Sequence, residues 1–194
     1  MTTIVLASTS PYRRELLQRL RVPFEVLAPA VDETRLPGET PLALALRLAE
    51  AKAMEVAGRR PDAIVIGSDQ VAELDGEPIG KPHTHDRALA QLERMQGRRL
   101  VFHTALAVIG HGQTVVESVP TTVTFRRLER QALEAYLRSD LPYDCAGAAK
   151  IESLGIALVE RVESDDPTAL IGLPLIRLTS MLAAAGLPVL DAGQ

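Results

Sequence analysis

Two adjacent arginines at the start of a helix are the first residues that need a chemical explanation. The stretch LASTSPYRRELLQRL ends a strand and begins a helix, with Ser10 suited to the N-cap and Pro11 to the first helical position. Arg13 and Arg14 then fall in the first turn. Because the helix dipole and the unpaired N–H groups already make this turn positive, two cations are unfavourable there. We therefore expect an anion to bind at this turn.

Carboxylates follow at positions that suit ligand binding. Asp69 ends the apolar run DAIVIGSD, which has the pattern of a buried strand. Ligands of open α/β sheets bind at such strand ends. Together with the pair Asp32 and Glu33, Asp69 offers oxygen ligands of the kind that Mg²⁺ or Mn²⁺ takes beside substrate phosphates. Taken singly, Asp69 would be a cap of the following segment and the acidic pair would be surface charge.

The lysines and the cysteine have plain interpretations when each is taken alone. Lys52 falls at the border of the apolar arc of a helix expected at 41–57, where a snorkelling side chain is the commoner outcome. Lys81 lies in a loop bounded by Gly and Pro after a DG turn, and alone it is a solvated residue. We interpret Cys145 as a small buried residue and not as a catalytic thiol.

The composition limits the class of protein. The 194 residues carry a net charge of −4 and contain only three Phe and three Tyr, which argues against a surface for nucleic acid. The single cysteine allows no internal disulfide, which suits a reducing compartment. No segment approaches the roughly 20 apolar residues of a membrane span, and MTTIVLAS is too short for a signal peptide. We expect a cytoplasmic protein without nucleic-acid or membrane partners.

Strand and helix patterns alternate along the chain and must position these residues. Strands are predicted at 2–8, 24–29, 62–69, 100–109, 113–125 and 155–162. Helices are predicted at 11–20, 41–57, 84–95 and 128–139, and a last one within 168–186 is interrupted or begins near Pro174. Because βα alternation is mixed with at least one hairpin, we expect one α/β domain over 1–194, with a mixed central sheet flanked by helices.

Six motifs, in register along the chain, resemble those of the Maf family of nucleoside triphosphate pyrophosphatases. They are LASTSPYRRELL, VDET, AEAKA, GSDQV with LDG and IGKP, CAGAAKIE, and IGLPL. The resemblance implies an elongated fold similar to that of inosine triphosphate pyrophosphatases, with a cleft between two lobes. It also implies hydrolysis of a nucleoside triphosphate to the monophosphate and diphosphate, with a divalent cation (Mg²⁺, Mn²⁺ or Co²⁺) as cofactor.

The resemblance assigns roles to individual residues. Asp69 matches the family's proton acceptor, which orients or deprotonates the water that attacks the α-phosphorus. Glu33 matches a family carboxylate that binds the metal, together with Asp69, or positions the water. Lys81 belongs with the catalytic residues as well. The cations and donors expected to bind the triphosphate are Ser8, Arg13, Arg14, Lys52 and Lys81.

Three positions depart from the commonest family pattern and concern the base. Tyr12 replaces the first arginine of the usual SPRR motif, Gln70 replaces a threonine, and Glu152 replaces a glutamine. The trio resembles the subfamily that acts on 7-methyl-GTP. A carboxylate can accept both the ring N–H and the amino group of guanine, and a ring such as that of Tyr12 stacks on a purine that methylation has made cationic. We therefore expect 7-methyl-GTP as substrate, removed as a modified nucleotide from the pool.

Two other functions stay open at this point. A pyrophosphatase acting on dTTP and UTP, or on many nucleotides, would keep every catalytic residue and differ only at the three base positions. A nucleotide-binding regulator without turnover is the second, since members of the family are linked to arrest of septum formation. The intact Asp69, Glu33 and Lys81 favour turnover. The oligomeric state is open too, a homodimer included.

Overall fold

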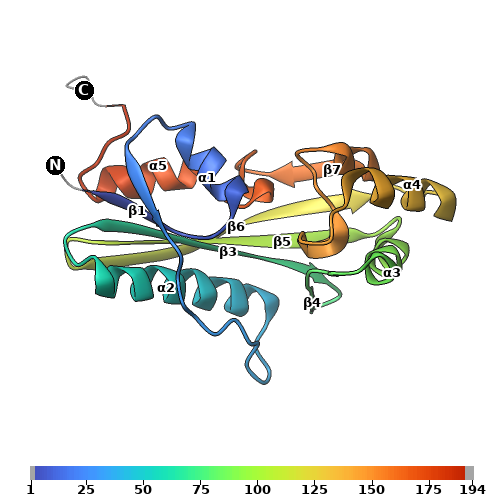
Figure 1. Cartoon of the computed structure of the whole chain (residues 1–194), viewed down its shortest axis with the longest axis horizontal. Coiled ribbons are helices and arrows are strands. Elements are labelled where there is room, and N and C mark those ends of the chain that lie inside the picture. Colours follow the sequence, from blue (N-terminus) through green and yellow to red (C-terminus); the bar gives the residue numbers. More distant parts are fainter. Residues whose placement is uncertain (1–2, 191–194) are drawn as a thin grey trace.

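One long mixed sheet organises the chain (Figure 1). The computed structural model describes residues 3–190, and its strands follow the order β2-β1-β3-β5-β6-β7, with β4 pairing with β3. β1 is parallel to β2 and β3, and the other pairs are antiparallel, so the predicted mixed sheet is confirmed. The strands are β1 (Ile4–Ala7), β2 (Phe24–Leu27), β3 (Ile64–Leu74), β4 (Glu77–Ile79), β5 (Arg99–Gly110), β6 (Gln113–Phe125) and β7 (Val159–Ser164).

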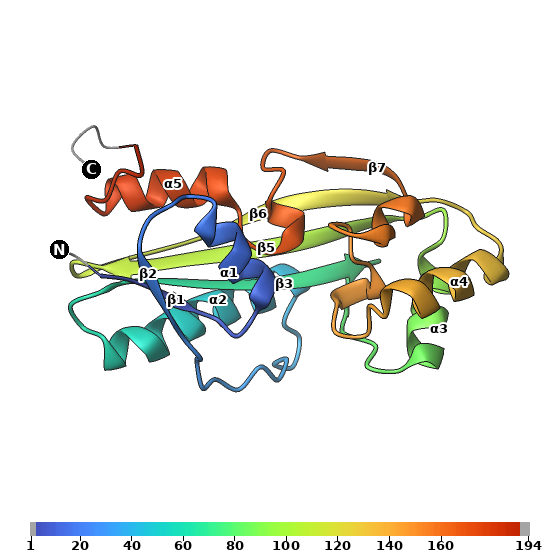
Figure 2. The ribbon, with the colours of Figure 1, turned by 45° about the horizontal axis from the view of Figure 1, so that its top comes forward.

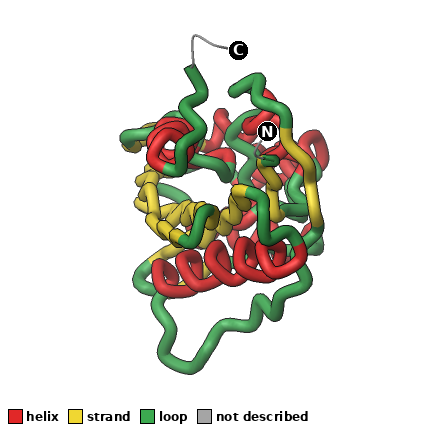
Figure 3. The backbone as a smooth tube through the Cα atoms, turned by 90° about the vertical axis from the view of Figure 1, so that its left-hand side faces the viewer, coloured by secondary structure: helices red, strands yellow, loops and turns green. Residues whose placement is uncertain are grey.

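Helices cover both faces of one half of the sheet and gather at the far end of its long strands (Figure 2). On one face lie α1 (Pro11–Gln18) and α5 (Leu175–Ala184), and on the other lies α2 (Pro41–Arg59), as the end-on view shows (Figure 3). At the far end lie α3 (His85–Met95) and α4 (Arg130–Asp140). The molecule is therefore elongated along β3, β5 and β6. Among residues 3–190, none of the helices has the length and apolar character needed to cross a membrane.

The local signals that predicted where helices begin are confirmed. Ser10 Oγ accepts a hydrogen bond from the Arg13 N–H at 3.4 Å, and Pro11 is the first residue of α1. Thr40 Oγ1 accepts one from the Ala43 N–H at 3.2 Å at the start of α2. Such caps satisfy donors that have no partner within the helix, which explains why short sequence patterns suffice to find them.

The β-hairpins differ in part from the prediction. β5 and β6 are joined as expected, and the DG turn is present, with φ of 57° at Asp75 and 80° at Gly76. That turn closes a hairpin whose second strand, β4, was not predicted, and β3 continues to Leu74 instead of ending near Asp69. β3 extends because its later residues keep pairing with β5 and β4 after the pairing with β1 stops at Gly67.

The predicted strand at 155–162 and the predicted last helical segment are each longer than the element in the structure. The predicted strand at 155–162 begins with a 3₁₀ turn, Leu154–Leu158, and only Val159 onward is β7. Gly155 lies against the Lys150 backbone, so the chain folds back there before it can extend. In the last segment the helix begins after Pro174, as one of the two alternatives stated, and a separate 3₁₀ turn covers Ala169–Ile171.

Three apolar clusters share the sheet. Side chains alternate between faces of β3, so that Ile66 packs beneath α1 and α5 while Val65 packs against α2. A third cluster at the far end joins α3 and α4 to later residues of the same strands, such as Ala72. α2 lies very close to the sheet, because a Cβ at Gly67 would be 2.3 Å from the carbonyl oxygen of Ala49. This close contact positions the side chains that α2 directs toward β3.

Candidate active site

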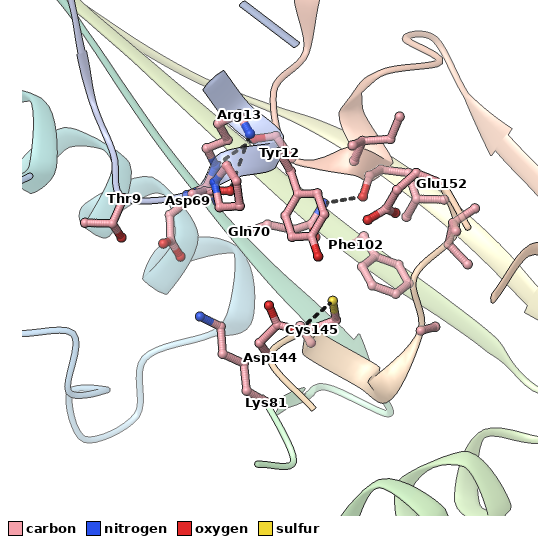
Figure 4. A pocket seen from close by; sticks show the side chains of 18 of the residues that line it. Thr9, Tyr12, Arg13, Asp69, Gln70, Lys81, Phe102, Asp144, Cys145 and Glu152 are labelled. Carbon is pink, nitrogen blue, oxygen red and sulfur yellow. Dashed lines mark hydrogen bonds between the residues drawn. The ribbon is translucent and has the colours of Figure 1, made fainter. Parts of the chain in front are cut away.

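A cavity of about 360 Å³ lies between α1, α2 and the loop that follows α4 (Figure 4). Eight of the ten predicted site residues line it, and Ser8 and Arg14 do not. Segments far apart in the sequence therefore converge on one space. The lining residues are Thr9, Ser10, Pro11, Tyr12, Arg13, Glu33, Lys52, Asp69, Gln70, Lys81, Phe102, Asp144, Cys145, Ala146, Ala149, Ile151, Glu152, Leu170, Ile171 and Gly172.

Lys52 joins the two carboxylates at one end of this cavity. Its Nζ lies 2.6 Å from Asp69 Oδ1 and 2.7 Å from Glu33 Oε1. Lys52 and Asp69 are 6% and 8% exposed, so the lysine does not snorkel to solvent and the aspartate does not act as a cap. The buried lysine holds the buried aspartate in place, because removing either charge of this pair would leave the other buried without compensation.

Asp69 lies inside a strand and not at its end, which corrects the prediction. The parallel half of the sheet nevertheless ends just before it, since β1 pairs with β3 only as far as Gly67. Beyond that point the space beside β3 is open to the loop that follows β1, and Asp69 points into it (Figure 4). The rule that ligands bind where parallel strands stop therefore still applies.

Glu33 is positioned by a loop that α2 holds in place. Arg47 of α2 donates to the Thr34 carbonyl oxygen at 3.0 Å and pairs with Glu39 Oε1 at 2.6 Å. Partial burial opposes ionisation of Glu33, but the hydrogen bond from Lys52 and the nearby positive charges outweigh it and lower the pKa of Glu33 below its ordinary value. Glu33 is therefore an anion at neutral pH.

Arg13 and Lys81 add positive charge at the same end. Arg13 Nε donates to the Gly172 carbonyl oxygen at 2.9 Å. Burial lowers the pKa of Arg13, and the Asp69 and Glu33 carboxylates oppose that shift, so the guanidinium stays a cation. Lys81 is exposed on the loop after β4, and its side chain points into the cavity (Figure 4).

The structure separates Ser8 and Arg14 from the other residues predicted to bind phosphate. Ser8 is 3% exposed, and its Oγ accepts the Ser10 N–H at 3.1 Å. Arg14 lines a neighbouring hollow with Ser8 and Val26, because consecutive residues of a helix point about 100° apart. Of the two arginines in the first turn, only Arg13 reaches the cavity that holds Asp69.

The opposite end of the cavity is acidic and carries the aromatic residue. Burial, together with the nearby Cys145, Asp144 and Glu152, raises the pKa of Tyr12 to about 12, so its phenol stays neutral. Partial burial also raises the pKa of Glu152, and nearby carboxylates add to this effect. The cavity thus has three cations together with two carboxylates around Lys52, and only acidic charge, from Asp144 and Glu152, near Tyr12.

Gln70 has its amide nitrogen fully engaged. Nε2 lies 2.9 Å from Thr104 Oγ1, 3.1 Å from the Ala169 carbonyl oxygen and 3.0 Å from that of Leu170. An amide nitrogen has two protons, so three acceptors already exceed its capacity. Gln70 Oε1 has no donor within residues 3–190, which makes this side chain an acceptor toward any ligand.

Several lining residues were not predicted as site residues. Asp144 and Phe102 have no local pattern that marks them, and the motif IGLPL predicts no role for the carbonyl group of Gly172. The prediction that Cys145 is buried is wrong, since it is only partly buried and lines the cavity. Burial and the neighbouring carboxylates raise the pKa of the Cys145 thiol to about 12.

The carboxylates at the basic end fit one kind of metal site. Within residues 3–190, no three His, Cys, Asp or Glu side chains gather closely enough to hold an ion by themselves. Mg²⁺ and related ions are commonly bound by one or two carboxylates together with substrate phosphates. Asp69 and Glu33, both within 2.7 Å of Lys52 Nζ, form such an incomplete set.

Known proteins similar to this chain carry consistent names. Two relatives named 7-methyl-GTP pyrophosphatase are 62% identical, from Thiobacillus denitrificans, and 61% identical, from Burkholderia thailandensis. The alignments cover 97% of this chain, and 94% and 90% of those relatives. A solved structure of a HAM1 protein from Coxiella burnetii aligns with a TM-score of 0.47 at 19% identity, over 66% of this chain and 75% of that one. The model of the family described as Maf-like protein matches residues 3–185, and the chain therefore belongs to the Maf family.

Proposed function

We propose that this chain hydrolyses 7-methyl-GTP to 7-methyl-GMP and diphosphate. The observation that carries the proposal is the separation of charge within one cavity: Arg13, Lys52 and Lys81 lie near Glu33, whereas Asp144 and Glu152 lie near Tyr12. The substrate has the same polarity, because its triphosphate is anionic and its methylated purine is cationic. Complementary charge favours binding in one orientation. The names of the relatives at about 60% identity support the same substrate.

At the phosphate end, the cations stabilise charge that develops on the reacting phosphoryl group. Arg13 is held by its bond to the Gly172 carbonyl oxygen, so its terminal nitrogens are oriented before substrate binds. Such preorganised donors act without reorganisation during the reaction. Lys81, on an exposed loop, adds a positive charge, and its long side chain can adjust to the position of the phosphates.

Asp69 is the proposed proton acceptor. Lys52 binds its Oδ1, which leaves Oδ2 to accept a proton from the attacking water or to orient it. Asp69 and Glu33 would also hold the divalent cation, for which Mg²⁺, Mn²⁺ and Co²⁺ are the candidates. When bound, such an ion neutralises phosphate charge and makes water easier to deprotonate.

At the base end, the acceptors suit a guanine and not a pyrimidine. Glu152 can accept both the ring N–H and the 2-amino group, as charged hydrogen bonds. Gln70 offers only Oε1, because its nitrogen is engaged by the protein. A pyrimidine such as uracil would present its carbonyl acceptors to these acceptors, which is unfavourable. Tyr12 would stack on the cationic ring.

The test is diphosphate release from 7-methyl-GTP, GTP, dTTP, UTP and CTP, with and without each of the three metals. We expect 7-methyl-GTP to have the highest kcat/KM. Asp69→Asn should lower the rate by about 100-fold or more, in the range typical of general base catalysis. The matched control is Asp62→Asn, at an exposed position outside the cavity, which should retain activity. A higher kcat/KM for pyrimidines would refute the substrate, and binding without turnover would favour a regulator.

The proposed cellular role is removal of a modified nucleotide from the cytoplasmic pool. A deletion strain should accumulate 7-methyl-GTP and lose the excess when the wild-type gene is restored. Restoring Asp69→Asn should leave the excess in place. An unchanged 7-methyl-GTP concentration in the deletion strain would contradict this role.

A further inference from the structure

A buried carboxylate that does not line the cavity closes a nearby loop. This loop contacts residues at both ends of the cavity. Asp166 is 2% exposed and lies at the start of the segment 166–176, which we call the 166–176 loop. Its Oδ1 accepts the Thr168 N–H at 2.8 Å and pairs with Thr168 Oγ1 at 2.7 Å, and its Oδ2 accepts the Ile176 N–H at 2.7 Å. One side chain therefore ties the beginning of the loop to its end.

Thr168 completes the closure. Its Oγ1 accepts the Leu175 N–H at 2.8 Å and lies 2.8 Å from the Leu173 carbonyl oxygen. Side chains at the start of the loop thus hold it to the first turn of α5. Hydrogen bonds to a buried charge are among the strongest in proteins, so this closure resists local opening.

The loop directs its carbonyl groups at residues of the cavity. The Gly172 carbonyl oxygen accepts from Arg13 Nε at 2.9 Å and from Ser68 Oγ at 3.0 Å. The Ala169 and Leu170 carbonyl oxygens accept from Gln70 Nε2. The same short loop therefore orients a residue of the phosphate end and a residue of the base end.

We propose that Asp166 is a positioning residue, which sets the geometry of Arg13 and Gln70 through the 166–176 loop. Asp166 lines no part of the cavity, so it acts without touching substrate. If the loop opened, Arg13 would lose its acceptor at Gly172, and Gln70 Nε2 would keep only Thr104 Oγ1 of its three. Gln70 Nε2 could then turn toward the base, and the side chain would no longer offer only an acceptor. Loss of Asp166 should therefore weaken both phosphate binding and base selectivity.

Asp166→Asn tests the inference, which rests on the proposed function. The amide would place its own N–H₂ against one of the donors that the carboxylate accepts. We expect kcat/KM for 7-methyl-GTP to fall about tenfold or more, as misplacement of positioning groups commonly causes. The ratio of kcat/KM for 7-methyl-GTP to that for GTP should fall as well. This ratio is independent of the fraction of folded enzyme.

Three further variants keep the test decisive. Thr168→Val removes the hydroxyl at nearly constant shape and should reproduce the altered ratio, whereas Thr168→Ser keeps the hydroxyl and should restore it. Leu137→Ala, at a fully buried position in the far cluster, should lower thermal stability and leave the ratio unchanged. If Asp166→Asn and Thr168→Val lower stability but leave both KM and the ratio at wild-type values, Asp166 is only structural and the inference is wrong.

The same data separate this inference from the proposed function. If the wild type does not prefer 7-methyl-GTP, the proposed substrate is wrong. The ratio is then taken between the preferred nucleotide and the next best one. A wild-type ratio in both Asp166→Asn and Thr168→Val would still overturn the positioning role.

Discussion

The sequence context of several single residues fits more than one role, and their partners in the structure decide between these roles. Lys52 has the sequence context of a snorkelling side chain, yet it is buried between Asp69 and Glu33. A buried ammonium is favourable only with such partners. Tyr12, Gln70 and Glu152 are similar cases, because each is ordinary alone and all three line one end of the same cavity.

Glu152→Gln should remove the preference for the methylated base. GTP presents the same ring N–H and amino group, so only the lost attraction between the carboxylate and the cationic ring changes the ratio of kcat/KM for 7-methyl-GTP to that for GTP, which should fall about tenfold. Initial rates of diphosphate release give the ratio. Glu160→Gln, at an exposed position outside the cavity, is the control. A ratio unchanged by Glu152→Gln would exclude this residue from base selection.

The same preference should depend on pH. Partial burial is the main cause that raises the pKa of Glu152, Asp140 and Asp144 add to it, and Lys150 opposes it. The carboxylate is therefore present above this raised pKa and lost as pH falls through it. The preference should disappear at a higher pH than the ordinary pKa of glutamate would give. In Glu152→Gln this acid limb should be absent from the ratio, and its persistence would assign it to another group.

At the scale of elements, the close contact between α2 and β3 positions the proposed catalytic residues. Lys52 is on α2 and Asp69 on β3, and Gly67 of β3 lies against Ala49 and Ala53 of the same helix. The distance from Lys52 Nζ to Asp69 Oδ1 thus depends on the absence of a side chain at Gly67. The helix cap at Thr40 and the loop held by Arg47 then bring Glu33 to the same lysine.

Gly67→Ala should push α2 away from the sheet. The added Cβ would lie 2.3 Å from the Ala49 carbonyl oxygen, which is backbone and cannot turn aside. We expect the free energy of unfolding to fall by about 1–3 kcal/mol, as for other overpacked cores, and kcat to fall with it. Urea denaturation measures the free energy of unfolding, and the rate of diphosphate release measures kcat.

Gly58→Ala is the matched control on the same helix. A Cβ at Gly58 would have no heavy atom within 4 Å. Alanine there should raise the free energy of unfolding by about 0.4–1 kcal/mol, because it reduces the freedom of the unfolded chain. Equal effects of the two substitutions would show that the close contact at Gly67 is unimportant.

At the scale of the whole molecule, the long strands connect all three apolar clusters. β3 and β5 contribute side chains to each cluster, so no cluster can be lost without exposing part of the others. We therefore predict one folding unit over the chain, with the cavity between its two halves. Cooperative unfolding is usual where a single sheet connects the core.

Scanning calorimetry should show one transition whose calorimetric and van't Hoff enthalpies agree. Leu106→Ala, beneath α1 and α5, and Leu137→Ala, at the far end, should both lower the midpoint of that same transition. Each change should cost about 2–5 kcal/mol, as expected for a buried leucine. Two transitions, each moved by only one of the substitutions, would contradict a single domain.

The sequence by itself determined what depends on neighbouring residues. The caps at Ser10 and Thr40, the turn at Asp75 and Gly76, and the mixed α/β order are confirmed, because they follow from local hydrogen bonds and from the period of the apolar residues. The six motifs in register also led to the Maf family, which the match over residues 3–185 confirms.

Only the tertiary structure decided which of these residues meet. Arg13 reaches the cavity and Arg14 does not, and Arg13 is held by Gly172, 159 residues later in the chain. The partial exposure of Cys145 and the closure of the 166–176 loop by Asp166 have no local signal either. Contacts of this kind depend on how the helices and loops pack on the sheet, and a local sequence pattern carries no record of that packing.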